Sequence, residues 1–329
     1  MKNIAIAMGG FSSEVEISIR SGNLVKDNLD AKKYKGYCIH VLEEDWFYLD
    51  DDKKRHPVNK SDFSLSIAGQ KIVFDVVYNT IHGTPGEDGK LQAYFELLGI
   101  VQTSCDFYQA ALTFNKRDCI SVLRKYGIKT AENFFLNAGE NVNEGQILQH
   151  VGLPCFVKAN RSGSSYGVIK VSQAEHLFKA IDEALKYDDQ LIIESFLEGT
   201  EVSVGCFTYQ GKIIALPVTE IVSENDFFDY EAKYLGKSQE ITPARITPEQ
   251  TKAVQEAMTT IYRVLNLKGV CRSEFIFHQG EAHFIEVNTN PGLSPESIIP
   301  QQVKEFGLSL AEFFDEIITH ALTASTKSS

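Results

Sequence analysis

The sequence predicts an α/β protein whose later regions are of the α+β type. The first observation is a buried strand at 3–8, followed by a glycine pair that makes a turn and by a stretch with helical spacing of its apolar residues. The second is a pair of further strands at 36–42 and 72–79, which suggests a parallel α/β domain over residues 1–103. The third is a hairpin at 269–288, which lies late in the chain between two helical stretches.

The first helix is expected at residues 13–29, where Ser12 or Ser13 can cap its first turn. A strand, a glycine turn, a helix and a strand also open a dinucleotide-binding domain. This sequence lacks the G-x-G-x-x-G fingerprint of such domains, so a nicotinamide-dependent dehydrogenase is disfavoured.

Two further regions follow the first domain. The second spans about 104–193 and the third about 194–325, with residues 326–329 as a frayed tail. In the second region we expect a helix at 111–127, strands at 154–159 and 167–171, a helix at 173–187 and a strand at 191–196. In the third we expect strands at 201–209 and 212–218, a long polar stretch at 220–247, a helix at 248–266, the hairpin and a final helix at 309–323.

Composition restricts the partners and the compartment. The 329 residues carry a net charge of -12, which argues against a nucleic-acid surface because such surfaces depend on Lys and Arg. No apolar run approaches the roughly 18 residues that a membrane helix needs, and the start MKNIAIAMGG is too short in apolar residues for a signal peptide. The six cysteines lack zinc-like spacing, so we expect reduced core residues in a cytoplasmic protein: Cys38, Cys105, Cys119, Cys155, Cys206 and Cys271.

The hairpin carries the first chemical pattern, because FIEVNTNPG places an acid and an amide at alternate positions before a Pro-Gly turn. A three-residue loop centred on Gly280 would set Glu274 opposite Glu286. The same register sets Arg272 opposite Asn288 and puts all four side chains on one face. A two-residue loop would instead place the two acids on different faces.

Two facing carboxylates repel each other unless something positive lies between them. A divalent cation would supply that charge, and a site made only of oxygen ligands favours Mg²⁺. The alternative is a solvated strand end with an Arg–Glu pair.

Three other features suggest a nucleotide site. Lys158 lies on a strand that runs into the Gly- and Ser-rich loop of VKANRSGSSYG, whose backbone N–H groups can approach phosphate oxygens. Lys116 is a further cation, and Glu194 and Glu201 can accept hydrogen bonds from ribose hydroxyls. Taken singly, each has a simpler interpretation: a flexible hairpin tip, a surface lysine, or linker acids in water.

Two loops complete the set of candidate segments. HGTPGEDGKLQ, at 82–92, forms a tight loop before a helix. FFDYEAKYLGK, at 227–237, lies inside the long polar stretch, and such a segment in a compact domain is more often functional than idle.

Together these motifs resemble the D-alanine–D-alanine ligases, a family of the ATP-grasp superfamily, over nearly the whole chain. The motifs that carry the resemblance are GG-x-S-S-E (9–14), HGTPGEDG (82–89), NK (115–116), VKANRSGSS (157–165), ESFLEGTE (194–201), YEAKY (230–234), RSE (272–274) and EVNTNPG (286–292). YEAKY and HG-x-x-GEDG are specific to this family, whereas the strand-end E-x-N is shared across ATP-grasp enzymes.

The resemblance implies a three-domain ATP-grasp architecture. The N-terminal parallel α/β domain over 1–103 would bind substrate, and 104–193 would form the central ATP-grasp subdomain. Residues 194–325 would form the catalytic ATP-grasp domain, with the segment 220–240 as its lid.

The resemblance also implies which residues bind the nucleotide and its metal ions. ATP, the co-substrate, would be contacted by Lys116, Lys158, Glu194, Phe196, Leu197, Glu201, Phe227 and Lys233. Two Mg²⁺ ions, with Mn²⁺ as an alternative, would be held by Glu274, Glu286 and Asn288. The family usually has Asp where this chain has Glu274, which leaves the coordination geometry at that position open.

For the first D-alanine, the resemblance implies that Glu14 accepts its amino group and that His82 lies nearby. Ser164 and Tyr234 would hydrogen-bond with Glu14 and hold the lid closed.

For the second D-alanine, Ser297 would bind the carboxylate, with Asn288 among the substrate-binding residues. Arg272 and the backbone N–H of Gly292 would stabilise the tetrahedral oxyanion.

The implied activity is the ATP-dependent joining of two D-alanine molecules into D-alanyl-D-alanine for peptidoglycan precursor synthesis. Phosphoryl transfer would turn the first carboxylate into an acyl phosphate, which the second amine attacks with release of phosphate.

The alternatives are a sibling ligase that joins D-alanine to D-serine or D-lactate, and a nucleotide-binding protein without turnover. Lactate-forming relatives typically lack the tyrosine found here at 234. Family members are commonly homodimers, so we expect a homodimer that acts on small molecules and binds neither nucleic acid nor membrane.

Overall fold

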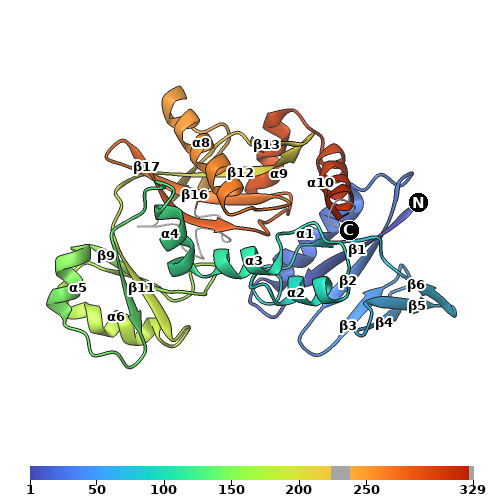
Figure 1. Cartoon of the computed structure of the whole chain (residues 1–329), viewed down its shortest axis with the longest axis horizontal. Coiled ribbons are helices and arrows are strands. Elements are labelled where there is room, and N and C mark those ends of the chain that lie inside the picture. The colour runs from blue at the N-terminus through green and yellow to red at the C-terminus, as the bar shows by residue number, and fades with distance from the viewer. Residues whose placement is uncertain (224–237, 326–329) are drawn as a thin grey trace.

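The computed structural model describes residues 1–223 and 238–325, which form three β-sheets covered by helices (Figure 1). A seven-stranded sheet from the start of the chain and a four-stranded sheet lie at opposite ends of the molecule. A six-stranded sheet lies between and above them in the view of Figure 1. The predicted fold class, α/β with later regions of α+β type, is confirmed.

The seven-stranded sheet has a parallel core with an antiparallel extension. β1 (Lys2–Gly9) pairs in parallel with β2 (Tyr34–Val41) and with β7 (Val76–Asn79), as the strand–helix–strand pattern predicted. The antiparallel strands, which the sequence did not reveal, are β3 (Trp46–Leu49), β4 (Arg55–Asn59), β5 (Ser64–Ile67) and β6 (Gln70–Ile72). The sheet is therefore mixed, and only its core is parallel.

The single strand predicted at 72–79 is wrong, because the chain turns between two strands there. β6 ends at Ile72 and β7 begins at Val76. Between them the Asp75 carboxylate accepts a hydrogen bond from the backbone N–H of Asn3 at 2.7 Å, which fastens the turn to the start of β1.

The first helix is present as α1 (Val15–Asp27), but neither predicted serine is its cap residue. Glu14 occupies the N-cap position, and its side chain makes no capping hydrogen bond. The Ser12 hydroxyl accepts from the Glu14 backbone N–H at 3.2 Å and donates to the His82 carbonyl at 3.0 Å. Ser12 thus ties the start of the helix to the loop at residue 82.

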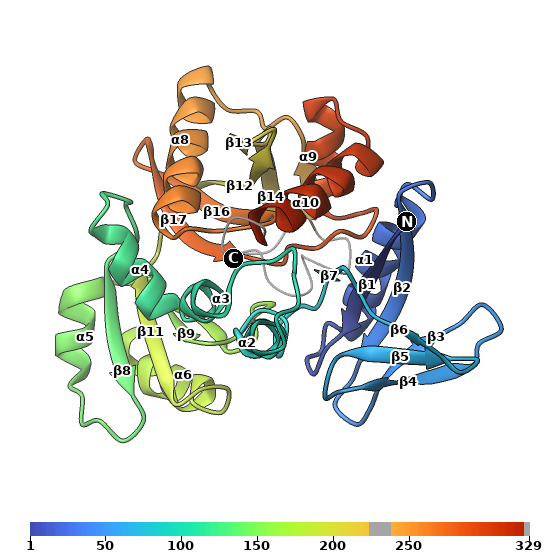
Figure 2. The ribbon, with the colours of Figure 1, turned by 45° about the vertical axis from the view of Figure 1, so that its right-hand side comes forward.

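The two faces of the seven-stranded sheet pack against different helices. One face, which includes Ile4, packs against α1 and the C-terminal helix α10 (Leu310–Ser325), and the other packs against α2 (Lys90–Leu97). The rings of Tyr78 in β7 and Phe314 in α10 meet edge to face, with centroids 5.7 Å apart. The end of the chain therefore supplies part of the N-terminal core (Figure 2).

The four-stranded sheet is antiparallel, with strand order β10-β9-β11-β8. Its strands are β8 (Asn133–Asn137), β9 (Cys155–Ala159), β10 (Val168–Val171) and β11 (Gln190–Ser195). The helices α5 (Glu144–Val151) and α6 (Leu177–Ala184) pack on one face, with the short 3₁₀-helix η1 (Ala174–His176) before α6. Three of these strands and α6 were predicted, whereas β8 and α5 were not.

The single helix predicted at 111–127 is wrong, because two helices meet there. α3 (Phe107–Phe114) ends before Asn115, and α4 (Lys116–Arg124) begins after it. The Asn115 side chain accepts from the backbone N–H of Asp118 at 3.1 Å and so caps α4. The break places Lys116 at the first helical position.

The six-stranded sheet has the order β15-β14-β12-β16-β17, with β13 paired to β12. Its strands are β12 (Gly199–Tyr209), β13 (Lys212–Ala215), β14 (Thr219–Ser223), β15 (Ser238–Ile241), β16 (Cys271–His278) and β17 (Glu281–Asn288). The helix α8 (Pro248–Val264) begins at a capping box formed by Thr247 and Gln250 and packs on one face. The unpredicted helix α9 (Ile298–Phe306) and α10 pack between this sheet and the seven-stranded sheet (Figure 2).

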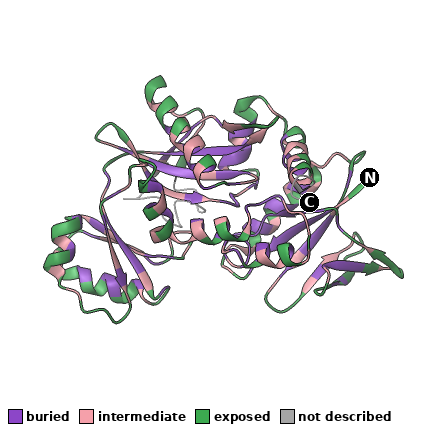
Figure 3. Ribbon diagram, in the orientation of Figure 1, coloured by how far each residue is buried: buried purple, intermediate pink, exposed green. Residues whose placement is uncertain are grey.

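The strands form the buried interior of all three sheets, while the outer helices expose one side (Figure 3). All six cysteines are buried and free of disulfides, so the prediction that they are core residues is confirmed. Among the helices that the structure describes, none combines the length and apolar character needed to cross a membrane.

Candidate active site

The acids of the hairpin face each other. Glu274 of β16 pairs directly with Glu286 of β17, and Arg272 pairs with Asn288. The predicted register is confirmed, and all four side chains share one face at the end of the two strands.

The turn that produces this register differs from the predicted one. The strands are joined by the two residues Gln279 and Gly280, with φ of 52° and 82°, rather than by a three-residue loop. Two successive residues with positive φ are typical of a type I′ turn, whose twist matches that of the strands. A two-residue turn alone would set Glu274 opposite Ile285.

A β-bulge at Ile285 restores the pairing of the acids. Phe275 pairs with Phe284, but the next residue of β16, Glu274, pairs with Glu286, so Ile285 is the extra residue on β17. As a result Ile285 and Glu286 are consecutive residues that both line the same cavity. The bulge could not be predicted, because Ile285 and Glu286 are both ordinary strand residues.

Each acid of the pair has a basic partner. The Arg272 guanidinium donates to Glu274 at 2.8 Å, and the Lys116 ammonium lies 3.7 Å from the Glu286 carboxylate. Asn288 presents an amide oxygen, which accepts from the backbone N–H of Asn290 at 2.9 Å.

The donor set fits a hard divalent cation, because it offers two carboxylates and an amide oxygen and no nitrogen or sulfur ligand. Nowhere in the described residues do three or more His, Cys, Asp or Glu side chains gather into a complete metal site. Phosphate oxygens and water would therefore have to complete the coordination of any ion held here.

A cavity of about 340 Å³ lies between the open face of the four-stranded sheet and the six-stranded sheet. It is lined by most of the residues predicted to contact ATP: Lys116, Lys158, Glu194, Phe196, Leu197 and Glu201. Glu274 and Glu286 also line it, from β16 and β17 of the six-stranded sheet. Phe196 packs near Phe156, with ring centroids 6.1 Å apart, and gives the cavity an apolar side.

Lys158 and Glu194 form a buried ion pair on the floor of this cavity. The ammonium lies 2.7 Å from the carboxylate, and the two side chains are 14% and 8% exposed. Burial by itself would lower the pKa of Lys158, but the charges of Glu194, Glu286 and Glu201 outweigh it and hold that pKa above its usual value. Lys158 therefore keeps its positive charge in this cavity.

The Gly- and Ser-rich loop at 161–166 closes one side of both cavities. Ser164 and Ser165 have φ of 49° and 60°, a left-handed conformation that turns successive backbone N–H groups the same way. The Lys116 ammonium donates to the Ser162 carbonyl at 2.6 Å, and Arg161 pairs with Asp188 at 2.6 Å. The loop is thus anchored both at α4 and at the connection between α6 and β11.

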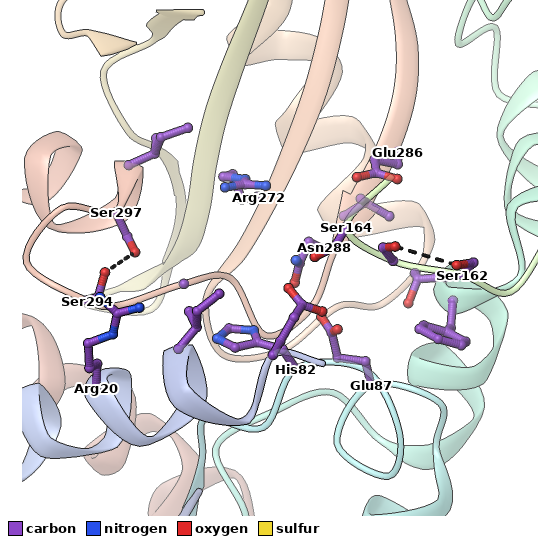
Figure 4. Close-up of a pocket in the computed structure, with 18 of the residues that line it drawn as sticks. Arg20, His82, Glu87, Ser162, Ser164, Arg272, Glu286, Asn288, Ser294 and Ser297 are labelled. Carbon is purple, nitrogen blue, oxygen red and sulfur yellow. Dashed lines mark hydrogen bonds between the residues drawn. The ribbon is translucent and has the colours of Figure 1, made fainter. Parts of the chain in front are cut away.

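A second cavity, of about 240 Å³, adjoins the first (Figure 4). Its walls hold the residues predicted to contact the amino-acid substrates: Glu14, His82, Ser164, Arg272, Asn288, Gly292 and Ser297. A β-carbon built on Gly163 would lie 3.6 Å from the Glu14 carboxylate, so α1 and the Ser-rich loop meet at this point.

Two buried titratable groups lie at the base of the second cavity. Burial lowers the pKa of His82, although the charge of Glu14 acts in the opposite direction. Burial also raises the pKa of Glu87 from 4.5 to about 8, with the charge of Glu14 adding to the effect. The Glu87 carboxyl accepts from the backbone N–H of Gly83 at 2.7 Å. Glu87 lies in the motif at 82–92, but no role was predicted for it. Its position among three glycines could have marked it as a site residue.

Gly292 and Ser297 lie against each other at the far end of the second cavity. A β-carbon on Gly292 would come within 2.8 Å of the Ser297 hydroxyl, so a larger residue there would force that hydroxyl to move. Ser297 is the N-cap residue of α9, yet its hydroxyl pairs with Ser294 at 2.9 Å and not with the helix. The first N–H groups of α9 therefore have no side-chain cap.

The loop at 82–89 is fastened to the end of β17 through one carbonyl. The Gly86 oxygen accepts from the side-chain amides of Asn79 at 2.9 Å, Asn290 at 2.6 Å, and Gln92. Segments about 200 positions apart thus form one wall.

Three predicted site residues, Phe227, Lys233 and Tyr234, lie outside the described residues, as does most of the segment 220–240.

The two cavities share one set of lining residues: Lys116, Ser162, Gly163, Ser164 and Glu286. The cavity lined by residues predicted to contact ATP therefore opens directly onto the cavity lined by residues predicted to contact the amino acids. Comparison with known proteins agrees with this arrangement. The family described as D-ala D-ala ligase N-terminus matches residues 3–105, and D-ala D-ala ligase C-terminus matches residues 122–319.

The chain belongs to the D-alanine–D-alanine ligase family. It is 60% identical over 321 residues to the D-alanine–D-alanine ligase of Christiangramia forsetii, an alignment that covers 98% of each chain. It is 57% identical over 322 residues to the D-alanine–D-alanine ligase of Flavobacterium johnsoniae, which covers 98% of this chain and all of the relative.

Solved structures similar to this chain include two ligases of the same fold. The D-Ala:D-Ser ligase VanG from Enterococcus faecalis is 31% identical, with a TM-score of 0.85 over 97% of this chain and 99% of that one. The D-alanyl-alanine synthetase A from Vibrio cholerae is 27% identical, with a TM-score of 0.87 over 98% of both chains. The resemblance to D-alanine–D-alanine ligases and the ATP-grasp architecture inferred from the motifs are thus confirmed.

Proposed function

We propose that this chain catalyses the ATP-dependent joining of two D-alanine molecules into D-alanyl-D-alanine, releasing ADP and phosphate, for peptidoglycan precursor synthesis. The observation that carries the proposal is the junction of the two cavities. Lys116, Ser164 and Glu286 line both of them. A phosphate bound at the end of one cavity would therefore face a carboxylate bound at the end of the other.

The first step in this proposal is transfer of the γ-phosphoryl group to the carboxylate of the first D-alanine. Lys116 and Lys158 would neutralise phosphate oxygens, and the backbone N–H groups of the Ser-rich loop would bind them. Glu14 would hold the substrate ammonium and thereby aim its carboxylate at the phosphate. Two Mg²⁺ ions held by Glu274, Glu286 and Asn288 would supply further positive charge at the phosphate oxygens.

The second step is attack by the amine of the second D-alanine on the acyl phosphate. The amine nitrogen forms a bond to the acyl carbon and loses a proton. The bond between that carbon and the phosphate oxygen then breaks, and phosphate leaves with the electron pair. Arg272 and the backbone N–H of Gly292 would donate to the developing oxyanion, an effect of typically about 3 kcal/mol for each donor. Because the acyl phosphate hydrolyses in water, the reaction needs a closed site.

The nearest alternative is a ligase that joins D-alanine to D-serine. It is favoured by one observation, the 31% identity to a D-Ala:D-Ser ligase over nearly the full length. The higher identity to D-alanine–D-alanine ligases supports D-alanine as the second substrate.

The proposal is tested by mass spectrometry of the products from ATP, Mg²⁺ and D-alanine, with D-serine and D-lactate as competing nucleophiles. We expect D-alanyl-D-alanine as the main product and phosphate release that depends on added D-alanine. L-Alanine is the matched control and should give neither. A main product that contains D-serine would overturn the assignment of the second substrate, and ATP hydrolysis without any dipeptide would overturn the ligase activity. The homodimer and the cytoplasmic location stay predictions.

A further inference from the structure

Arg20 is a cation of the second cavity that the sequence motifs did not assign. It lies on α1, three positions after Ile17 and six after Glu14, the N-cap residue of the helix. All three residues line this cavity. Figure 4 shows its side chain extending from α1 toward Ser294 and Ser297. This end of the cavity is remote from the nucleotide, because none of these residues lines the nucleotide cavity.

The position of Arg20 is fixed by the residue next to it. The Ser21 hydroxyl accepts from the backbone N–H of Leu293 at 3.0 Å, and both residues are buried. This bond holds α1 against the loop that runs from Gly292 to Ser297. Arg20 therefore reaches the same loop from the adjacent position, with its own side chain exposed to the cavity.

Arg20 also differs from the other cations of the cavity in its partners. Lys116 lies 3.7 Å from Glu286, and Arg272 donates to Glu274 at 2.8 Å. Within the part of the chain that the structure describes, Arg20 makes no hydrogen bond and no ion pair. Its guanidinium is thus available for an anion that enters the cavity.

The groups around Arg20 suit a carboxylate. Ser294 and Ser297 offer hydroxyls, and the first N–H groups of α9 have no side-chain cap and point toward the N-cap residue Ser297. The acids Glu240 and Glu296 also line this cavity, and they would repel an anion that lacked a basic partner. A guanidinium can bind both oxygens of a carboxylate in one plane, which gives orientation as well as charge.

We propose that Arg20 binds the carboxylate of the second amino acid, together with Ser297, and so sets the requirement for a free carboxylate at that position. This inference rests on the proposed function. With the carboxylate held at the Arg20 end, the amine of the second substrate points back toward Arg272 and the acyl phosphate. Arg20 acts on binding and orientation and takes no part in the bond changes.

The test compares two acyl acceptors, D-alanine and D-alaninamide, which have nearly the same shape but differ in charge. For Arg20→Gln we expect the KM for the second D-alanine to rise about tenfold or more, since a charge-assisted hydrogen bond is lost. We expect kcat at saturation and the KM for ATP to stay within about twofold of wild type. The preference for D-alanine over D-alaninamide should fall by the same factor as the KM rises.

Two further variants separate a binding role from a general effect of charge or folding. Arg20→Lys keeps the charge but not the planar fork, and it should recover part of the acceptor preference. Arg263→Gln removes another exposed cation, from α8 and outside both cavities, and should leave the preference unchanged. Arg20 is exposed, so melting temperatures of all three variants should match wild type.

The outcomes distinguish this inference from the proposed function. If wild type makes the dipeptide and Arg20→Gln keeps the wild-type KM and acceptor preference, the assignment of Arg20 is wrong. A lower kcat with an unchanged acceptor preference would contradict it equally. If wild type makes no dipeptide at all, the ligase proposal itself fails, whatever Arg20 does.

Discussion

Glu274 and Glu286 stand directly opposite each other across β16 and β17, although the two-residue turn that joins these strands would by itself set them out of register. The extra residue Ile285 shifts the pairing by one position on β17 and so brings the two acids into register. The bulge has a second effect, because it turns two consecutive side chains of β17 toward the nucleotide cavity. One irregular residue therefore shapes both the acidic pair and the apolar wall beside it.

We expect Glu286→Gln to lower kcat by about a hundredfold or more, because a neutral amide binds a divalent cation more weakly than a carboxylate does. The measurement is steady-state turnover across a Mg²⁺ titration, together with calorimetry of ATP binding in Mg²⁺. Glu281→Gln is the matched control, since Glu281 lies on the same strand but is exposed and paired with Lys129. Near-normal turnover in Glu286→Gln would show that the metal assignment is wrong.

We expect Lys158→Met to lose ATP affinity and also to destabilise the fold. The change leaves the Glu194 carboxylate, which is 8% exposed, without its positive partner. Breaking a buried pair in this way lowers the free energy of unfolding by about 3–5 kcal/mol. The double variant Lys158→Met/Glu194→Gln should recover most of the stability but not the ATP affinity. Denaturant unfolding and nucleotide calorimetry measure the two effects separately, and recovery of both together would contradict a phosphate-binding role for Lys158.

Glu87 should make stability depend on pH. Because the pKa of its carboxyl is raised from 4.5 to about 8 in the folded chain, its stabilising contribution is fully present below pH 4.5 and is lost as the pH rises through 8. Glu87→Gln keeps an acceptor for the Gly83 N–H and cannot ionise. The variant should therefore gain stability relative to wild type at pH 8.5, by roughly 1.4 kcal/mol for each unit of pKa difference.

The measurement for Glu87 is the free energy of unfolding of both proteins at several pH values between 4.5 and 9. The difference between them isolates Glu87 from the other titrating groups. A difference that stays constant over this range would mean that Glu87 ionises normally in the folded chain.

Gln279→Asn should stabilise the hairpin without changing activity. Gln279 holds a φ of 52° ahead of Gly280, and Asn-Gly is the preferred pair in a type I′ turn. We expect a gain of about 0.5 kcal/mol in the free energy of unfolding. Gln279→Val is the opposite control, since a β-branched residue resists positive φ, and it should lower the melting temperature. If both variants melted alike, the turn would not have the geometry described.

Most residues that line the two cavities could be predicted because they lie in short motifs, and the family resemblance that these motifs carry implied the rest. The hairpin register was predicted from an assumed three-residue loop, and the alternation of side chains then placed the four residues on one face. The parallel core of the first sheet was predicted from the order of strand, glycine turn, helix and strand. The position of Glu286 was nevertheless right for a partly wrong reason: the loop was shorter than predicted, and the bulge at Ile285 compensated. The alternation of apolar and polar residues predicts which face of a sheet each side chain occupies. Whether a strand contains an extra residue depends instead on its pairing with the neighbouring strands.

The elements that were missed share a physical cause. β3 to β6, β8, β14 and β15 are short strands, and α5 and α9 are short helices, so none carries enough periodic residues to stand out. The break at Asn115 was missed because an asparagine is tolerated in a helix, although here its side chain caps the next one. Arg20 belongs to no motif, and only the packing of α1 against the loop after Pro291 brings it into the cavity.

The contact of α10 with the first sheet bears on how this protein can be handled in the laboratory. The family descriptions divide the chain near residue 105, yet the face of β7 that carries Tyr78 is covered by Phe314 and its neighbours. A gene fragment that encodes only residues 1–105 would yield a product with that apolar face bare to solvent. We expect such a product to aggregate on expression, whereas adding a separate C-terminal fragment would give it the surface it needs to stay in solution.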